Sequence, residues 1–318
     1  MTNRQTISAF VEGEKVNTPL LITAVTRGVT TSGSPYASLT LQDQTGNIEA
    51  KVWDVKEDIV ALLVPGKVVG VSGEVLKYRN ALQLRVFSVT PLAEDAFNPA
   101  DFVSGSSLSD EFMKQRIEST VDSLSDEVIR QICRKSVDYF GDKLYVYPAA
   151  ARNHHDFVGG LATHMIGMLD IAESLCKLYP ILNRDLLLSG VILHDLGKIV
   201  ELSGPILTEY TLEGKLVGHI SIMQSMVVDF AKQLGFENSE QVVLMRHLIL
   251  SHHGEYEYGS PILPMIMEAE ILNFVDNIDA RMNMFLKALD PIEPGQFTPR
   301  VFSLENRAFY KPSFNEKK

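Results

Sequence analysis

The chain has 318 residues, of which 45% are hydrophobic and 22% charged, as in a globular protein of one large domain or two to three ordinary ones. Its formal net charge of −11 excludes a generally basic protein that coats nucleic acid. The longest apolar run, residues 186–193, is too short to span a bilayer and the N-terminal residues lack a signal-peptide core, so we expect a cytoplasmic protein without membrane contact.

Residues 18–90 have the β-branched, alternating pattern of strands. Gln44–Asn47 is a turn signal between the second and third strands, and another turn separates the last two. A short helical piece at residues 56–63 lies between the third strand and the fourth. Five strands with a helix in that position match an OB-fold barrel, which we place at residues 1–90. Another small β-barrel with a structural role is the alternative.

An OB-fold binds single strands by stacking bases on aromatic side chains along a basic groove. Trp53 is the single tryptophan, and Lys51 lies two residues earlier on the same strand face, which suits stacking beside a phosphate contact. Trp53 filling the barrel core is the alternative. Residues 1–90 carry nine basic and eight acidic residues, so we expect modest, salt-sensitive affinity. The candidate contacts are Tyr36, Lys51, Trp53, Lys77, Tyr78, Arg79 and Arg85.

The rest of the chain is predicted to be mostly helical, which makes the whole a multidomain α and β protein. Residues 91–150 begin as a linker and continue as two helices that start near Ser109 and Asp126. Residues 151–290 form a helical domain, and residues 291–318 a C-terminal extension whose apolar residues favour a homo-oligomer. The predicted domain helices cover residues 157–178, 184–200, 217–234, 239–252 and 264–289, with a hairpin or loop at 208–217. Cys133 and Cys176 fall in helical patterns without CxxC spacing and are expected to be buried thiols.

All eight histidines lie between residues 154 and 253. They occur on successive predicted helices, and an aspartate follows on the last one, in the order H…HD…H…HH…D. Several interrupt apolar helix faces, where an imidazole or carboxylate is costly unless it is paired or binds a metal. One such histidine needs only a backbone hydrogen bond, but seven positions on five helices indicate one shared centre, because bundle helices project such groups inward. The seven positions are His164, His194, Asp195, His219, His252, His253 and Asp276.

The motif HDLGK at residues 194–198 resembles the most specific element of the HD superfamily of metal-dependent phosphohydrolases. With a β-barrel in front, nearly the whole chain is similar to the YhaM family of bacterial 3′→5′ exoribonucleases. The segments that carry this resemblance are HHDFVGGLATH, LNRDLLLSGVILHDLGKI, GHISI, HLILSHHGEYEYGSP, DNIDARM and ENRAFYKP. The resemblance implies hydrolysis of single-stranded RNA from its 3′ end, with single-stranded DNA as a further candidate substrate.

Carried over to this sequence, the resemblance implies two metal ions bridged by one carboxylate. The first ion would be held by His164, His194, Asp195 and Asp276. The second would be held by Asp195, His219, His252 and His253. Imidazole and carboxylate ligands suit Mn²⁺, Fe²⁺, Ni²⁺ or Zn²⁺ better than Ca²⁺, and the resemblance implies Mn²⁺. Two such ions activate a water and clamp a phosphodiester for in-line attack.

Residues next to these seven positions carry further expectations. Lys198 follows Asp195 by three residues, on the same predicted helix face, and is assigned a catalytic role as donor to a phosphate oxygen; an exposed lysine near a helix end is the alternative. His247 is expected to be structural, since it lies on a different face from His252. Asp279 orients a ligand histidine or is a solvated acid. His154 and His155 either line the pocket mouth or contact substrate, or they lie at the surface. Arg300, Arg307 and Lys311 either line the strand entrance or pack between domains or subunits.

Two other functions are weighed against the exoribonuclease. An HD phosphohydrolase of small nucleotides or cyclic dinucleotides is disfavoured by the barrel and by the lack of a GYP motif beside the HD pair. A non-catalytic single-strand-binding protein with a structural metal domain is disfavoured because all seven ligand positions are present.

Overall fold

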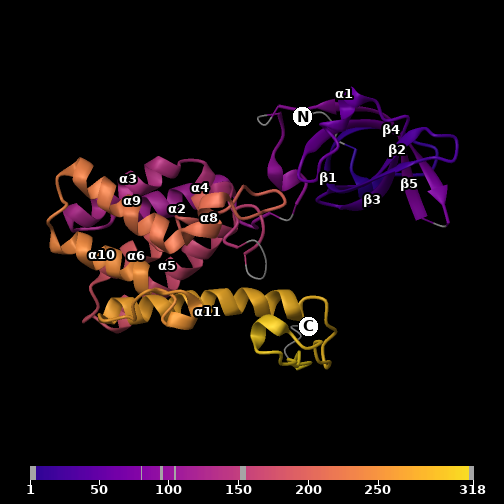
Figure 1. Ribbon diagram of the computed structural model, residues 1–318. Coiled ribbons are helices and arrows are strands. Elements are labelled where there is room, and N and C mark those ends of the chain that lie inside the picture. The colour runs from indigo at the N-terminus through magenta and orange to yellow at the C-terminus, as the bar shows by residue number, and fades with distance from the viewer. Residues whose placement is uncertain (1–4, 80, 94–95, 104, 151–154, 315–318) are drawn as a thin grey trace. The chain divides into compact units, whose positions relative to one another are not determined.

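The computed structural model describes residues 5–79, 81–93, 96–103, 105–150 and 155–314 (Figure 1). The chain divides into two compact units, Met1–Gly105 and Ser106–Lys318. The first consists of strands and the second of helices, as the sequence predicts. Each unit has its own hydrophobic core.

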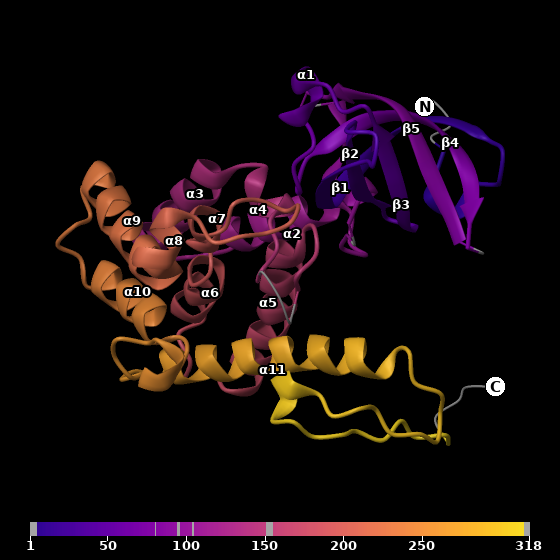
Figure 2. The same ribbon diagram turned by 45° about the vertical axis from the view of Figure 1, so that its right-hand side comes forward.

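The first unit is a closed five-stranded barrel with strand order β1-β2-β3-β5-β4 (Figures 1 and 2). Strands β3 and β5 are parallel, and the other neighbours are antiparallel. A single-turn helix, α1, separates β3 from β4, so the predicted OB-fold is confirmed. The strands are β1 (Lys15–Val29), β2 (Pro35–Asp43), β3 (Gly46–Trp53), β4 (Val68–Tyr78) and β5 (Ala81–Pro91), with α1 at Glu57–Val60.

The segment after β5, predicted as the start of a linker, is attached to the barrel. The carbonyl of Phe102 accepts a hydrogen bond from Gln42 Nε2 at 2.9 Å, and the carbonyl of Asp101 accepts one from Gln44 N at 2.9 Å. The side chain of Phe102 is fully buried. These backbone contacts explain why the first compact unit continues to Gly105.

The second unit packs its helices around one core (Figure 1). Its first two helices have the predicted N-caps, because Ser109 Oγ accepts from Phe112 N and Asp126 Oδ1 from Ile129 N. Both helices contribute to the same core as the later ones. The helices are α2 (Asp110–Asp122), α3 (Glu127–Phe140), α4 (Lys143–Val146), α5 (Gly160–Leu178), α6 (Arg184–Leu193), α7 (Lys198–Glu201), α8 (Leu212–Leu216), α9 (Gly218–Leu234), α10 (Glu240–Ser251) and α11 (Met267–Leu289).

The single helix predicted over residues 184–200 is wrong, because α6 ends at Leu193. The next backbone amides bond to carbonyls three residues back, including Lys198 N to Asp195 O at 2.9 Å, so the chain tightens into turns. A Cβ on Gly197 would lie 2.3 Å from the carbonyl oxygen of His219, so only glycine lets the turn pack against the start of α9. His194 and Asp195 therefore lie in a tight turn between two helices.

The segment predicted as a hairpin or loop at 208–217 contains a short helix instead. Thr211 Oγ1 accepts from Gly214 N at 2.9 Å and caps the start of α8. Cys133 is buried as expected, whereas Cys176 is half-buried, and both are free thiols.

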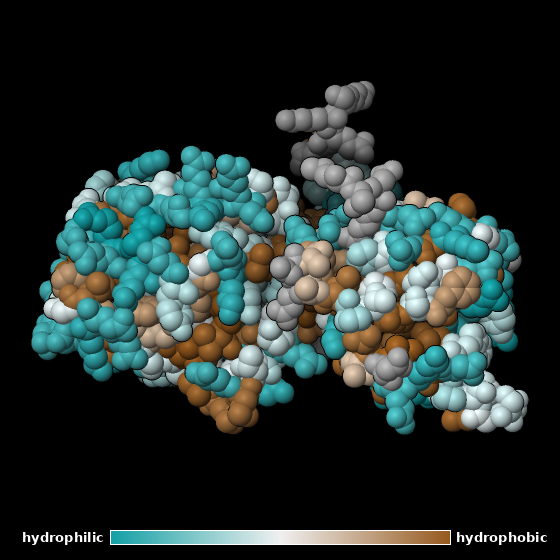
Figure 3. All heavy atoms as spheres, turned by 90° about the horizontal axis from the view of Figure 1, so that it is seen from above, coloured by the Kyte–Doolittle hydropathy of each residue, from teal (hydrophilic) through white to brown (hydrophobic). Residues whose placement is uncertain are grey.

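The surface shows hydrophobic residues among hydrophilic ones on both units (Figure 3). Within the described ranges, every helix is too short or too polar to traverse a lipid bilayer.

Candidate metal centre and strand-binding face

Three helices bring the first group of ligand atoms together. His164 comes from the first turns of α5, His194 follows α6, and Asp276 lies in α11. One ligand atom of each lies within 4.8 Å of those of the other two. His164 Nε2 is 3.1 Å from Asp276 Oδ1. His164 and Asp276, which are 112 positions apart in the chain, thus meet at one buried point. This agrees with the shared centre that the sequence predicts.

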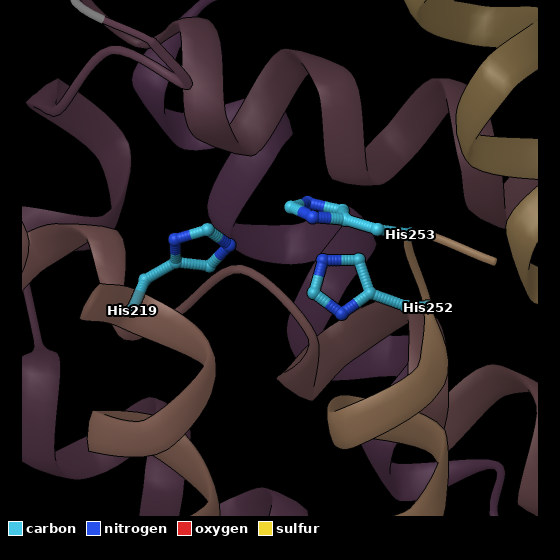
Figure 4. A group of neighbouring side chains, drawn as sticks. All are labelled: His219, His252 and His253. Carbon is cyan, nitrogen blue, oxygen red and sulfur yellow. The ribbon is translucent and has the colours of Figure 1, made fainter. Parts of the chain in front are cut away.

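A second group consists of three histidines. His219 lies in the first turn of α9, and His252 and His253 follow the end of α10, so the rings approach each other from two sides (Figure 4). Their ligand nitrogens also lie within 4.8 Å of one another. All three rings are at least mostly buried. The geometry therefore forms a second three-ligand cluster beside the first.

Asp195 lies between the two groups. Its Oδ2 is 3.4 Å from His194 Nε2 in the first group. Its Oδ1 is 3.4 Å from His219 Nε2 and 3.8 Å from His252 Nε2 in the second. The two oxygens of one buried carboxylate therefore face opposite clusters, which is the arrangement of a bridging ligand.

The outer nitrogen of every clustered histidine has a hydrogen-bond acceptor. Two of these acceptors are carboxylates: Asp279 Oδ2 is 2.6 Å from His164 Nδ1, and Glu201 Oε1 is 3.0 Å from His219 Nδ1. The other three are carbonyls, of Val191 for His194, of Ile249 for His252 and of Tyr258 for His253, at 2.7–2.9 Å. With the proton at Nδ1, the lone pair of each Nε2 points inward, as metal-binding histidines require.

Several inward-facing atoms fit a metal ion because they lack any other partner. Among the described residues, the buried Nε2 atoms of His194, His219 and His252 and the Oδ1 of Asp195 have no hydrogen-bond partner. Each such atom costs about 1–3 kcal/mol when left unsatisfied in a protein interior. Divalent ions would satisfy all four at once, so the donor set and its burial fit the implied metal.

The local charges suit the same role. Burial raises the pKa of the Asp195 carboxyl, but the Lys198 ammonium and His194 outweigh this and hold that pKa well below its usual value. Burial and the neighbouring His253 hold the pKa of His252 well below its usual value. An ionised carboxylate and a neutral imidazole are the protonation states that bind metal. Burial lowers the pKa of His164, whereas hydrogen bonds to Asp276 and Asp279 raise it to about 9, so binding there displaces a proton.

Lys198 lies at the edge of this centre. Its Nζ is 2.7 Å from Asp195 Oδ2 and its side chain is mostly buried. Burial lowers the pKa of Lys198, but the charge of Asp195 outweighs it and raises that pKa, so the amine stays charged. The alternative of an exposed helix-end lysine is wrong, since Lys198 is buried against the centre.

The structure decides between the alternatives for several other residues near the centre. Asp279 orients His164, so the solvated alternative is wrong. His155 is buried, with its Nε2 3.5 Å from Asp279 Oδ2, so its surface alternative is wrong. His247 is structural, because its Nε2 accepts from Met265 N at 2.9 Å. His154 lies outside the described residues.

Glu201 is a functional residue that the sequence reasoning missed. Besides holding His219 Nδ1, its Oε1 accepts from His219 N at 3.1 Å, so one carboxylate fixes both the ring and the backbone. Burial raises the pKa of Glu201, but the contacts with His219 together outweigh this effect. The pKa is therefore below its usual value, and the carboxylate stays ionised. The signal was present, since Glu201 is an acid within the apolar run Ile199–Leu202.

Four of the predicted strand contacts share one outer face of the barrel, on β2, β3 and β5. Tyr36 pairs with Trp53 across the strands, and their ring centres are 5.4 Å apart. Trp53 is 50% exposed, so its placement in the barrel core is wrong. Lys51 pairs with Arg85, and its Nζ lies 5.3 Å from the centre of the Tyr36 ring.

Two of these basic groups already have partners in the barrel. The Lys51 ammonium donates to Ser38 Oγ, and Arg85 forms an ion pair with Glu74 at 2.7 Å. Both pairs are partly exposed, and a solvent-exposed ion pair such as Arg85–Glu74 is a weak interaction.

The other three predicted contacts, Lys77, Tyr78 and Arg79, lie at the hairpin between β4 and β5. Tyr78 is exposed, and the Arg79 guanidinium lies 5.3 Å from the centre of its ring. Arg79 has a φ of 47°, as expected in a tight turn. The hairpin therefore presents an aromatic and basic tip.

The three basic residues of the C-terminal extension that the structure describes have partners in this segment or at the end of α11. Arg307 forms an ion pair with Glu305, Lys311 Nζ donates to the Leu289 carbonyl, and Arg300 donates to the Asn306 carbonyl. These contacts favour a packing role within this segment, which lies beside the second half of α11 (Figure 2).

Comparison with known proteins agrees with this architecture. A family model described as an OB-fold nucleic acid binding domain matches residues 21–92, and the HD domain model matches residues 161–281. The 3′-5′ exoribonuclease YhaM of Geobacillus sp. (strain WCH70) is 47% identical over 304 residues, which cover 95% of this chain and 94% of that protein. The 3′-5′ exoribonuclease YhaM of Bacillus pumilus (strain SAFR-032) is 45% identical over 311 residues, with 98% and 99% covered. With such identity over nearly the full length, and with both domains in the same order, this chain belongs to the YhaM family of 3′-5′ exoribonucleases.

Proposed function

We propose that this protein is a metal-dependent 3′-5′ exoribonuclease that hydrolyses single-stranded RNA at a centre of two divalent ions. The observation that carries the two-ion assignment is the position of Asp195, whose two oxygens face two separate ligand clusters. The polarity and the RNA substrate rest on the family to which the chain belongs.

The residues divide naturally into two ion sites that share Asp195. The first would consist of His164, His194, Asp195 and Asp276. The second would consist of Asp195, His219, His252 and His253. Nitrogen and carboxylate donors together suit Mn²⁺, Fe²⁺, Ni²⁺ or Zn²⁺, and of these the family resemblance points to Mn²⁺. When bound, two such ions lower the pKa of a shared water and offset the charge of the phosphodiester oxygens.

The surrounding side chains hold this centre and supply charge. Glu201 and Asp279 fix the orientation of His219 and His164, so little reorganisation is needed when substrate arrives. Lys198 remains protonated beside Asp195. In the proposed mechanism its ammonium donates to a phosphate oxygen as negative charge develops there, and Asp195 stays ionised throughout.

The barrel would hold the strand whose end is degraded. Tyr36 and Trp53 offer aromatic surfaces with Lys51 and Arg85 beside them, and the β4–β5 hairpin offers further cations. Such a face accepts single-stranded RNA, and also single-stranded DNA, because stacking and phosphate contacts do not depend on the 2′-hydroxyl.

Labelled RNA tests the activity. With Mn²⁺, 5′-end-labelled RNA should shorten through a ladder of products, and 3′-end-labelled RNA should release its label as a mononucleotide at once. A panel of free nucleotides and cyclic dinucleotides should remain intact under the same conditions. Preferential hydrolysis of that panel would instead assign a small-nucleotide phosphohydrolase.

Replacing Trp53 by Ala should weaken strand binding by about 5- to 150-fold, the loss expected for one stacked base. The measurement is fluorescence anisotropy with labelled single-stranded RNA at fixed salt. Val11→Ala is the control, since Val11 is exposed on the same unit but outside the aromatic face. Equal affinities of the two variants would remove Trp53 from the binding face.

Self-association is proposed through α11. Phe274, Ile278, Met282 and Leu286 are all exposed and follow one another every four residues along one side of the helix. A second copy can cover this stripe with its own, as in an isologous dimer. Light scattering should give at least a dimer for the protein and a monomer for Met282→Lys, while Leu212→Lys, at an exposed apolar residue of α8, stays associated. A monomeric wild type would contradict the proposal.

A further inference from the structure

A cleft of about 270 Å³ opens beside the metal centre. Its floor consists of Lys198, His253 and Asp276, which belong to the centre itself. Its walls include Tyr258 and Asn277, which have no role in holding the ligand cluster through their side chains. The cleft thus joins a charged floor, suited to a phosphate, to walls of a different chemistry.

Tyr258 lines this cleft and carries an exposed aromatic side chain. Its side chain is 69% exposed, although it lies beside a buried site. Its backbone carbonyl accepts from His253 Nδ1 at 2.7 Å, and Ser260 Oγ in the same turn accepts from His253 N at 3.1 Å. The turn that orients a ligand histidine therefore also fixes the backbone from which the Tyr258 ring extends.

Helix α11 forms the opposite wall. Asn277 directly follows Asp276, and its exposed amide offers both a donor and an acceptor. The neighbouring Asn273 uses its own amide to hold the His252 carbonyl at 2.8 Å. Ala280, one turn further, lines the cleft with a side chain that takes little space.

We propose that this cleft holds the 3′-terminal nucleoside of RNA, with its base stacked on Tyr258 and its ribose hydroxyls hydrogen-bonded to Asn277. This inference rests on the proposed exonuclease function. An enzyme that removes one nucleotide at a time must hold the terminal nucleoside next to the phosphate that reacts. The charged residues at the floor of the cleft would bind that phosphate at the ligand clusters, so the rest of the cleft is left for the nucleoside. An aromatic ring binds any base, whereas an amide beside the ribose distinguishes a terminal diol from a deoxyribose.

Paired tyrosine variants test the stacking wall. Tyr258→Ala should lower kcat/KM for an RNA oligonucleotide by about 5- to 150-fold and weaken AMP binding, measured by calorimetry, over the same range. Tyr256→Ala is the matched control, because Tyr256 is 59% exposed in the same turn but does not line the cleft. Tyr258→Phe should keep most of the activity. If kcat/KM on RNA falls in neither Tyr258→Ala nor Tyr256→Ala, or falls equally in both, Tyr258 has no specific stacking role.

The ribose contact has its own test. The wild type should prefer an RNA that ends in a ribonucleotide over the same RNA with a 3′-terminal 2′-deoxynucleotide by about 2- to 10-fold, the effect of one hydrogen bond. Asn277→Ala should hydrolyse both equally. A preference that survives in Asn277→Ala would overturn this assignment.

A small diester separates failure of this inference from failure of the proposed function. Bis(p-nitrophenyl) phosphate has no nucleoside to place in the cleft, so Tyr258→Ala and Ala280→Leu should lose much less activity on this diester with Mn²⁺ than on RNA. Ala280→Leu, which fills the cleft, should nevertheless lose activity on RNA. If the wild type hydrolyses neither substrate, the metal-dependent phosphodiesterase itself is wrong, and if Ala280→Leu degrades RNA normally, only the nucleoside cleft is wrong.

Discussion

The double variant His194→Ala/Asp195→Ala should lose RNA hydrolysis by about a thousandfold or more, because the metal centre contributes several kcal/mol of transition-state stabilisation. His194 belongs to the first cluster and Asp195 to both, so neither ion site keeps its ligands. Strand binding should be retained, since the barrel is a separate compact unit. The measurement combines a product ladder from labelled RNA with fluorescence anisotropy on the same oligonucleotide.

His247→Gln is the matched control for this variant. His247 is a histidine of the same helical unit that lies outside both clusters and accepts from Met265 N. The amide oxygen of glutamine can accept that bond, so hydrolysis should be unchanged. Undiminished turnover in the double variant would place the reaction elsewhere in the protein.

Removing metal should lower the thermal stability of the helical unit and leave the barrel unaffected. Among the described residues, the Nε2 atoms of His194, His219 and His252 and the Oδ1 of Asp195 have no hydrogen-bond partner, so they would be left unsatisfied without metal. With metal at a hundredfold excess over its Kd, binding stabilises by about 2.7 kcal/mol, which corresponds to roughly 5–10 °C for a unit of this size. Calorimetry with Mn²⁺ and then with EDTA measures the shift.

The double variant provides the control for the thermal experiment. In His194→Ala/Asp195→Ala the same chelator should leave the transition of the helical unit where it is, because the ligands are already gone. A wild-type transition that does not move on chelation would mean that no ion is bound at the clustered atoms.

The sequence predicted that the site residues converge, because each of them is a polar side chain in an apolar stretch, and its burial is unfavourable on its own. A carboxylate such as Asp276 beside Val275, or an imidazole such as His164 on an apolar helix, is unfavourable unless something in the fold satisfies it. The outward placement of Trp53, which the sequence left open, follows from the period of its strand. Ile48, Ala50 and Val52 are the buried residues of β3, and the period of a strand then sends the odd-numbered neighbours outward.

The parts that the sequence did not predict depend on contacts between distant segments. The turn after α6 depends on the close approach of Gly197 to the His219 backbone. The periodic pattern of apolar residues in the sequence does not reveal such a contact. The partnership of Glu201 with His219, and of His155 with Asp279, likewise arises only when separate elements pack. The cleft beside Tyr258 requires both the turn after α10 and one side of α11.

Anomalous diffraction from crystals grown with Mn²⁺ tests the two-ion centre most directly. Two peaks about 3.5–4 Å apart are expected, one on each side of the Asp195 carboxylate, since two-metal hydrolases have this spacing. One should lie among His164, His194 and Asp276, and the other among His219, His252 and His253. A single peak, or none among these side chains, would contradict the account.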